Sequence, residues 1–481
     1  METTKETEVR FTELADDILR RAEHLAETAT ERVSSNTIRL GVTGLSRAGK
    51  TVFITSLVSN LLNTGRMPQL ISAAEGRILA AYLEPRPAVS VPRFRYEDHL
   101  ATLTGDHPDW PEGTRRISEL RLSLKVQPRG LLSGLSAPRT VHIDIIDYPG
   151  EWLLDLSLLS TSYAEWSSDV IAGLSRTQPG REFERILNGL LPDDPCPTED
   201  RLSEIATAFQ HHLQALQAAG IADCGPGRLL LPGDLEGSPM LSFAPLPEVA
   251  NAPRSSLYRE FERRYEGYKK KVVQPFFRNH FSRIDRQIVL IDVLGALGQG
   301  PAALDDLRQT MGKVLTAFRP GRAGRLARLI GISRVEKILF AVTKADHLHH
   351  SQHPALTSLG EALLEDARSR ARFAGAGTAS LSIAALRTTV EDTVNDASGQ
   401  PVPVVKGRLT SGGKQVAFHA GDLPVNPQVL LSEASRRADS WVGYTFTNAQ
   451  FAPAPLTRTA NGGPPHIRLD KACEFLLGDR L

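Results

Sequence analysis

Eight residues early in the chain have the types and spacing of a phosphate-binding loop. They run from Gly44 to Thr51 and match the pattern G-x-x-x-x-G-K-[ST]. Glycines let successive backbone N–H groups point inward at phosphate oxygens, and a following helix adds the positive end of its dipole. Lys50 would contact the β- and γ-phosphates, and the Thr51 hydroxyl would bind Mg²⁺. The pattern predicts a nucleotide-phosphate site lined by Ser46, Arg47, Ala48, Gly49, Lys50, Thr51 and Val52.

A second motif, Asp147-Tyr-Pro-Gly150, comes directly after an apolar segment at 140–146 that is typical of a strand. In P-loop proteins that hydrolyse nucleotides, an aspartate at a strand end contacts Mg²⁺. We therefore expect Asp147 to help bind the metal and the Gly150 N–H to meet the γ-phosphate. A plain strand-to-turn junction is the alternative, because Asp, Pro and Gly all favour turns.

A third motif, Thr343-Lys-Ala-Asp346, follows another apolar strand pattern at 337–342 and has the form of a guanine-reading element with Thr in place of Asn. The Asp346 carboxylate can accept the N1–H and N2–H₂ donors of guanine, whereas adenine offers no such pair. The stem of Lys344 can lie along the base. The expected ligands are GTP or GDP with Mg²⁺. The alternative is that the protein is an ATPase, which would bind ATP instead. A further strand end is expected to bring a backbone N–H near the guanine carbonyl, from Ala384, Ala385 or Leu386.

Hydrolysis also needs a switch residue that completes the Mg²⁺ site when the γ-phosphate is present. Thr114 lies in a loop just before the first strand of a predicted hairpin, which is the place of the switch threonine in a Ras-like domain. Thr102 and Thr104 compete for this role, and an ordinary loop or cap threonine is the alternative for Thr114.

The residue after the glycine of the second motif is expected to orient the attacking water. Ras-like enzymes often have glutamine there, but this chain has Glu151. A carboxylate can accept a hydrogen bond from water, yet it adds negative charge beside a phosphate. We therefore expect slow hydrolysis, or a non-catalytic module that recruits a partner according to its nucleotide. Three arginines could offset the charge as internal arginine fingers, or could be solvated surface residues: Arg47, Arg115 and Arg116.

The elements around these motifs predict an α/β fold. Strand patterns at 37–43, 119–126, 140–146, 287–293, 337–342 and 379–386 would form a mostly parallel sheet, with helices on both faces and nucleotide at the strand carboxyl ends. The second and third strands read as a hairpin, and a helical stretch is expected at 71–83. The predicted parts are an N-terminal helix (1–36), two halves of a nucleotide-binding domain (37–150, with an insertion at about 63–113, and 284–386), a helical insertion (151–283), and a β excursion with a terminal helix (387–481).

Composition sets outer limits on function. The formal net charge of the 481-residue chain is +1, so no overall attraction to nucleic acid follows. The three cysteines are far apart, which argues against a disulfide scaffold and favours a cytoplasmic protein. No apolar run reaches the roughly 18 residues that span a bilayer. An arginine-rich stretch could contact anionic lipid at the inner membrane, or could be the solvent-exposed face of a helix whose other face is in the core. Its arginines are Arg319, Arg322, Arg325, Arg328 and Arg334.

Taken together, the motifs resemble the YcjX family of bacterial P-loop proteins. The resemblance extends from about 37 to 481, and the N-terminal helix is its least covered part. It implies a Ras-like G domain with insertions, guanine-nucleotide binding and a link to envelope or general stress. The protein partner stays unknown and could be an inner-membrane protein. The matching segments are 44–51, Asp147-Tyr-Pro-Gly-Glu-Trp-Leu-Leu-Asp155, Asn279-His-Phe, Asp285-Arg-Gln-Ile-Val-Leu290, Thr343-Lys-Ala-Asp-His347 and Pro465-His-Ile-Arg-Leu469.

Overall fold

A computed structural model describes residues 36–85, 91–129, 137–175, 177–316, 335–373, 375–454 and 462–481. The predicted N-terminal helix and the arginine-rich stretch up to Arg334 lie outside these residues. Among the described residues, no helix combines the length and the apolar character needed to cross a bilayer.

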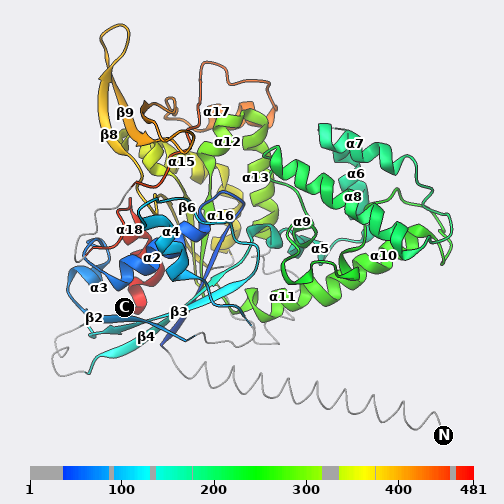
Figure 1. Ribbon diagram of the computed structural model, residues 1–481, viewed down its shortest axis with the longest axis horizontal. Helices are drawn as coiled ribbons and strands as arrows, with labels where there is room; N and C mark the ends of the chain where they lie inside the picture. The colour runs from blue at the N-terminus through cyan, green and yellow to red at the C-terminus, as the bar shows by residue number, and fades with distance from the viewer. Residues whose placement is uncertain are drawn as a thin grey trace.

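A seven-stranded mixed sheet has the strand order β2-β3-β4-β1-β5-β6-β7. Figure 1 labels its strands β2, β3, β4 and β6. Neighbouring strands from β4 to β7 pair in parallel, whereas β2, β3 and β4 pair antiparallel. This arrangement confirms the α/β fold and the predicted hairpin. The strands are β1 (Thr37–Gly44), β2 (Ile78–Glu84), β3 (Ser118–Val126), β4 (Arg139–Asp147), β5 (Arg286–Ile291), β6 (Lys337–Val342) and β7 (Gly377–Ser382).

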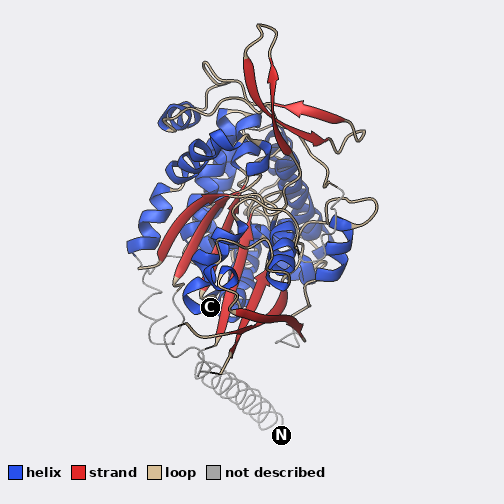
Figure 2. Cartoon of the chain, turned by 90° about the vertical axis from the view of Figure 1, so that its left-hand side faces the viewer, coloured by secondary structure: helices blue, strands red, loops and turns tan. Residues whose placement is uncertain are grey.

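Both faces of the sheet are buried, because its central strands are apolar at successive positions. Ile288 and Leu290 of β5 face one core, whereas Val289 and Ile291 face the other. Helices cover both sides, as Figure 2 shows. The first core contains α2 (Lys50–Leu62), α4 (Tyr96–Thr104) and α18 (Leu469–Leu477). The second core contains α12 (Val293–Gln299), α13 (Pro301–Thr316), α15 (His353–Leu363) and α16 (Glu365–Phe373).

The region between β4 and β5 is largely helical, as the sequence predicts, and lies beside the sheet (Figure 1). Its core is aromatic: the rings of Trp166 and Tyr265 stack at 5.1 Å, and Phe209 and Phe243 meet Trp166 edge-on. This core is continuous with the second core of the sheet, so the insertion is packed onto the α/β part of the chain. Its helices are α5 (Asp155–Leu158), α6 (Tyr163–Leu174), α7 (Gln178–Leu187), α8 (Glu199–Ala218), α9 (Gly227–Leu230), α10 (Leu257–Tyr268) and α11 (Gln274–Asn279).

The prediction of a helix at 71–83 is wrong over most of that segment. Helix α3 covers Ile71–Ala74 only and is followed by Gly76, whose φ of +67° suits a residue without a side chain. The remainder forms β2, which extends the sheet beyond β3. Ala80 and Ala81 favour helix intrinsically, but the hydrogen-bond ladder offered by β3 overrides that preference.

The C-terminal part contains the expected β excursion and terminal helix. A three-stranded antiparallel sheet has the order β10-β9-β8 and projects away from the main sheet (Figure 2). The terminal helix is α18, which covers Leu469–Leu477. The other elements are β8 (Val390–Asn395), β9 (Pro401–Arg408), β10 (Gln415–Phe418) and α17 (Gln428–Ser435).

Asp155, at the start of α5, holds the insertion together near the sheet. Its buried carboxylate accepts from the Gly227 N–H at 2.7 Å, the Arg228 N–H at 3.1 Å and the Tyr268 hydroxyl at 2.6 Å. Burial raises the pKa of this carboxyl to about 6, and the hydrogen bonds oppose that rise. One side chain therefore joins α5, α9 and α10.

Replacing Asp155 tests this role. We expect Asp155→Ala to lower the free energy of local opening by about 3 kcal/mol, because buried donors on Gly227, Arg228 and Tyr268 lose their acceptor. Hydrogen exchange in α9 and α10 measures the change. Asp169→Ala, at an exposed position of α6, is the matched control and should change exchange little. Equal protection in both variants would contradict the assignment.

Candidate functional site

The sheet brings the three motifs to one edge. Strands β4, β1, β5, β6 and β7 are parallel, so their carboxyl ends lie together. The phosphate loop follows β1, Asp147 ends β4, and Thr343 follows β6. Strand β3 runs the other way and pairs Ser118 with Asp147, so the loop before it carries Thr114 to the same edge. This edge is where open α/β sheets bind ligands.

The phosphate loop has the backbone geometry of an anion site. Gly49 has φ +85° and precedes α2 without any side-chain cap, so the first N–H groups of that helix are left for a ligand. Arg47 has φ +67°, an unusual conformation for a residue with a side chain. The ammonium of Lys50 is buried and donates to the Gly44 carbonyl at 2.5 Å. The positively charged end of Lys50 is thus held inside the loop.

Three side chains with oxygen atoms lie in or beside the loop: Thr51, Thr114 and Asp147. The Thr114 hydroxyl donates to Oδ2 of Asp147 at 2.8 Å, while Oδ1 of this carboxylate is buried and has no hydrogen-bond partner among the described residues. Burial raises the pKa of Asp147 to about 6, against the opposing effects of Lys50 and Thr114. Within the described part of the chain, the Thr51 hydroxyl donates to the Glu112 carbonyl alone, at 3.4 Å. An unpartnered carboxylate oxygen on a residue that also contacts the Thr114 hydroxyl fits a hard cation such as Mg²⁺.

The two competing threonines lie elsewhere. The hydroxyls of Thr102 and Thr104 donate to the carbonyls of Asp98 and Leu100, within α4. Their hydrogen-bonding capacity is thus used inside that helix, and Thr114 is the threonine that meets Asp147.

The turn after β4 packs directly on the phosphate loop. A Cβ at Gly150 would lie 2.3 Å from the Gly44 carbonyl oxygen, so only glycine fits there. The next residue, Glu151, is buried, and its Oε1 accepts from the Ser46 N–H at 2.8 Å and the Ser46 hydroxyl at 2.7 Å. Glu151 therefore lies next to the loop, as expected, but one of its two carboxylate oxygens, Oε1, already accepts hydrogen bonds from the loop.

Residues outside the third motif form hydrogen bonds and an ion pair with its side chains. Asp346 is buried, and its Oδ2 accepts from the N–H and the hydroxyl of Thr388 at 2.9 and 2.7 Å. Lys344 has φ +62°, and its ammonium lies 2.5 Å from Oδ2 of Asp292. The Thr343 hydroxyl donates to the Ile291 carbonyl at 3.3 Å. These contacts set the direction of the two charged side chains.

The C-terminal segment supports the same side of the site. Arg468 donates to the Ser382 carbonyl at 3.0 Å and to Nδ1 of His353 at 3.1 Å. The other ring nitrogen of His353 donates to the Ala345 carbonyl at 2.8 Å. The Ala384 N–H donates to the Ile467 carbonyl at 3.1 Å and is thereby occupied. For the other two N–H groups expected near a base, those of Ala385 and Leu386, the described residues provide no acceptor.

One cavity of about 590 Å³ joins the phosphate loop to the third motif, and its size suits a small ligand. Sequence reasoning predicted most of its lining, including 46–52, Thr114, Thr343, Lys344, Asp346 and 384–386. Residues that it missed include Trp110, Thr388 and Phe451. Asp292 was also missed, although it directly follows the buried strand β5, just as Thr343 follows β6. Thr388 and Phe451 carry no comparable signal in the sequence.

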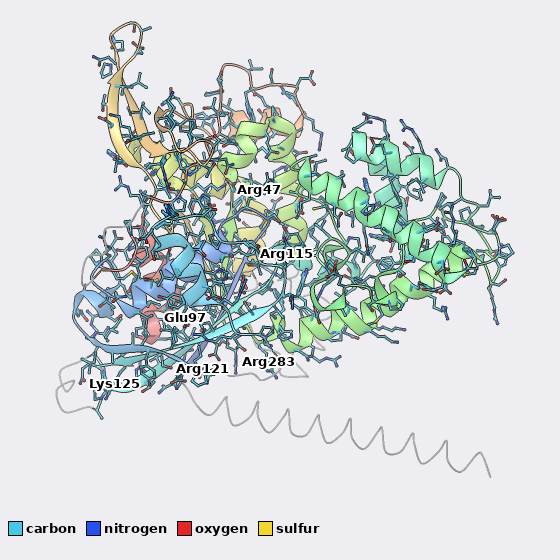
Figure 3. All side chains as sticks on the ribbon, in the orientation of Figure 1. Arg47, Glu97, Arg115, Arg121, Lys125 and Arg283 are labelled. Atoms are coloured by element: carbon cyan, nitrogen blue, oxygen red, sulfur yellow. The ribbon has the colours of Figure 1, made fainter. Side chains whose placement is uncertain are left out.

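The three arginines considered as internal fingers are exposed: Arg47, Arg115 and Arg116. Figure 3 labels Arg47 and Arg115, which in this view lie between the sheet and the helical insertion. Among the described contacts, none joins these guanidinium groups to Glu151 or Asp147.

Comparisons with known proteins agree with this geometry. The model of the YcjX-like family, DUF463, matches residues 38–481. A protein of Escherichia coli named Ras-like GTPase YcjX is 37% identical over 459 residues, which is 92% of this chain and 96% of that protein. A protein of the same name from Shewanella oneidensis is 35% identical over 494 residues, covering 97% and 99% of the two chains.

The contact between Gly150 and Gly44 yields a direct test. We expect Gly150→Ala to push the turn away from the phosphate loop, at an overpacking cost of about 1–3 kcal/mol. Hydrogen exchange at 44–51 and 147–155 should rise in this variant.

Gly173→Ala is the matched control, because a Cβ on Gly173 in α6 meets open space. Its exchange at both segments should equal that of the wild type. Unchanged exchange in Gly150→Ala would show that the turn tolerates a side chain and would contradict the packing argument.

Proposed function

The chain belongs to the YcjX-like family, and on that premise we propose that it binds guanine nucleotide and acts as a slow, Mg²⁺-dependent GTPase whose loops report the nucleotide state. The relatives named Ras-like GTPase support the guanine nucleotide and the P-loop chemistry. The finer roles of individual residues rest on the contacts described above.

The observation that carries the proposal is the continuous cavity between the phosphate loop and Asp346. A nucleotide needs one end that holds phosphate and another that reads the base, at a fixed separation. Here Lys50 and the first turn of α2 supply the first end. The Asp346 carboxylate, held by Thr388, supplies the second and favours guanine over adenine.

Three side chains would hold the metal: Thr51, Thr114 and Asp147. When bound, Mg²⁺ would neutralise charge on the β- and γ-phosphates. The unpartnered Oδ1 of Asp147 supports this role, since a buried carboxylate oxygen without a partner is costly. Thr114 and Gly150 come from two loops that flank the same site, so both could respond to the γ-phosphate.

The hydrogen bonds of Glu151 favour slow turnover. Its Oε1 accepts two hydrogen bonds from Ser46, and its charge opposes that of a γ-phosphate. The same observation favours a second candidate, a non-catalytic module that recruits a partner when loaded with nucleotide. Measured turnover separates the two, and competition by ATP separates both from an ATPase.

Base and phosphate recognition can be tested by titration calorimetry with GDP, GTP and ATP. We expect Lys50→Ala to weaken GTP and GDP binding by about 100-fold, because a buried charge-assisted contact is lost. Asp346→Ala should weaken guanine nucleotides by about 100-fold and leave ATP unchanged, because two donors of the base lose their acceptor. Asp366→Ala, at an exposed position of α16, controls for the loss of one negative charge.

The switch role of Thr114 gives a separate test. Thr114→Ala should weaken Mg²⁺-dependent GTP binding by about tenfold and leave GDP binding nearly unchanged, because its hydroxyl is needed only with the γ-phosphate present. Thr104→Ala removes a hydroxyl that bonds inside α4 and serves as control. Equal loss of GDP and GTP affinity in Thr114→Ala would argue for a structural role instead.

Single-turnover hydrolysis decides the enzymatic part. Phosphate release from bound GTP should require Mg²⁺ and should fall to background in Lys50→Ala. Wild-type release no faster than this background would remove the GTPase proposal and leave the binding proposal standing.

A further inference from the structure

The last turn of α8, in the helical insertion, touches the phosphate loop. Gln217 donates from Nε2 to the Ser46 hydroxyl oxygen at 2.9 Å. The same hydroxyl donates to Oε1 of Glu151. A chain of hydrogen bonds thus joins the insertion, the phosphate loop and the turn after β4.

Other contacts hold this end of α8 in place. After the helix, Asp223 forms an ion pair with Lys313 of α13 at 2.5 Å. Gly220 has φ +81° and lies so close to α12 that a Cβ would be 2.2 Å from Oε1 of Gln299. The carboxamide of Gln217 is therefore presented to the loop by a helix end that is anchored on α12 and α13.

A second cavity, of about 490 Å³, opens at this junction. Its lining includes Ser46, Glu151, Gln217 and Cys224. The space is large enough for several water molecules. Water can therefore reach the side of the phosphate loop that faces Glu151 and Gln217.

The direction of attack in phosphoryl transfer selects this side. The attacking oxygen approaches the γ-phosphorus roughly in line with the leaving oxygen, from the side opposite the β-phosphate. The β-phosphate end is expected at Lys50 and the first turn of α2, and the turn at Gly150 packs on the other end of the loop. Glu151 and Gln217 both lie at that other end, where they meet Ser46.

Of these two side chains, Gln217 is the one that can orient water without adding negative charge beside the phosphate. Glu151 carries charge, and its Oε1 already accepts two hydrogen bonds. Gln217 is neutral and uses Nε2 on Ser46, while the described residues provide no donor to its Oε1. The free oxygen can accept a hydrogen bond from water without adding negative charge beside the phosphate.

We propose that Gln217 is a catalytic residue supplied by the helical insertion, and that its Oε1 orients the water that attacks GTP. This inference rests on the proposed GTPase function. The water oxygen forms a bond to the γ-phosphorus, and the bond from that phosphorus to the bridging oxygen breaks, leaving its electron pair on GDP. The water proton passes to an oxygen of the released phosphate, and Gln217 neither gains nor loses a proton.

Single-turnover hydrolysis of GTP in the full chain, with GDP affinity measured in parallel, tests the assignment. Gln217→Ala should lower the rate constant at least tenfold and change GDP affinity less than about twofold, because the residue acts on the water. Gln217→Glu keeps the size of the side chain but adds charge and should also be slow. Gln210→Ala, two turns earlier on α8 and outside the lining of this cavity, is the matched control and should keep the wild-type rate.

Two results would overturn the inference while leaving the GTPase proposal intact. One is a wild-type rate in Gln217→Ala. The other is a rate loss in Gln217→Ala that is matched by an equal loss of GDP affinity and by lower hydrogen-exchange protection in α8. That result would mean that Gln217 has a structural role and does not act on the water. If the wild type itself releases no phosphate above Lys50→Ala, the GTPase proposal fails first and the inference falls with it.

Discussion

The backbone contact between Gly150 and the Gly44 carbonyl is the constraint on which the site depends. It presses the turn after β4 onto the phosphate loop with no side chain between them. The neighbours of Gly150 are placed as a result: Asp147 faces Lys50 and Thr114, and Glu151 reaches Ser46. A change in the position of this turn would therefore alter the proposed metal ligands and the loop together.

The helical insertion is tied to this turn more closely than its place in the chain suggests. It starts a few residues after Gly150, and its aromatic core merges with one face of the sheet. Asp155 joins its first helix to α9 and α10, while Gln217 returns to the loop from the end of α8. The insertion is thus held together by Asp155 and contacts the phosphate loop through Gln217.

The end of the site that is proposed to read the base is supported by residues that lie far from it in the chain. There, residues from distant parts of the chain fix the two charged side chains of a short motif. Asp292 holds Lys344, Thr388 holds Asp346, and Arg468 supports the strand end through Ser382 and His353. Because Thr388 and Arg468 lie in the C-terminal part of the chain, this end gains its shape only when that part is in place.

The sequence alone determined what is local in this protein. The phosphate loop, Asp147 with Gly150, and Asp346 are recognisable because their chemistry requires particular residue types at short spacing, and the apolar runs before them mark buried strands. The tertiary structure decided what depends on partners distant in the chain. Segment 78–84 became a strand because β3 offered a hydrogen-bond ladder, and Glu151 bonds to the loop because Ser46 lies beside it. Gln217 reached the loop because the residues after α8 contact α12 and α13. Such contacts depend on packing between elements, which residue spacing does not encode.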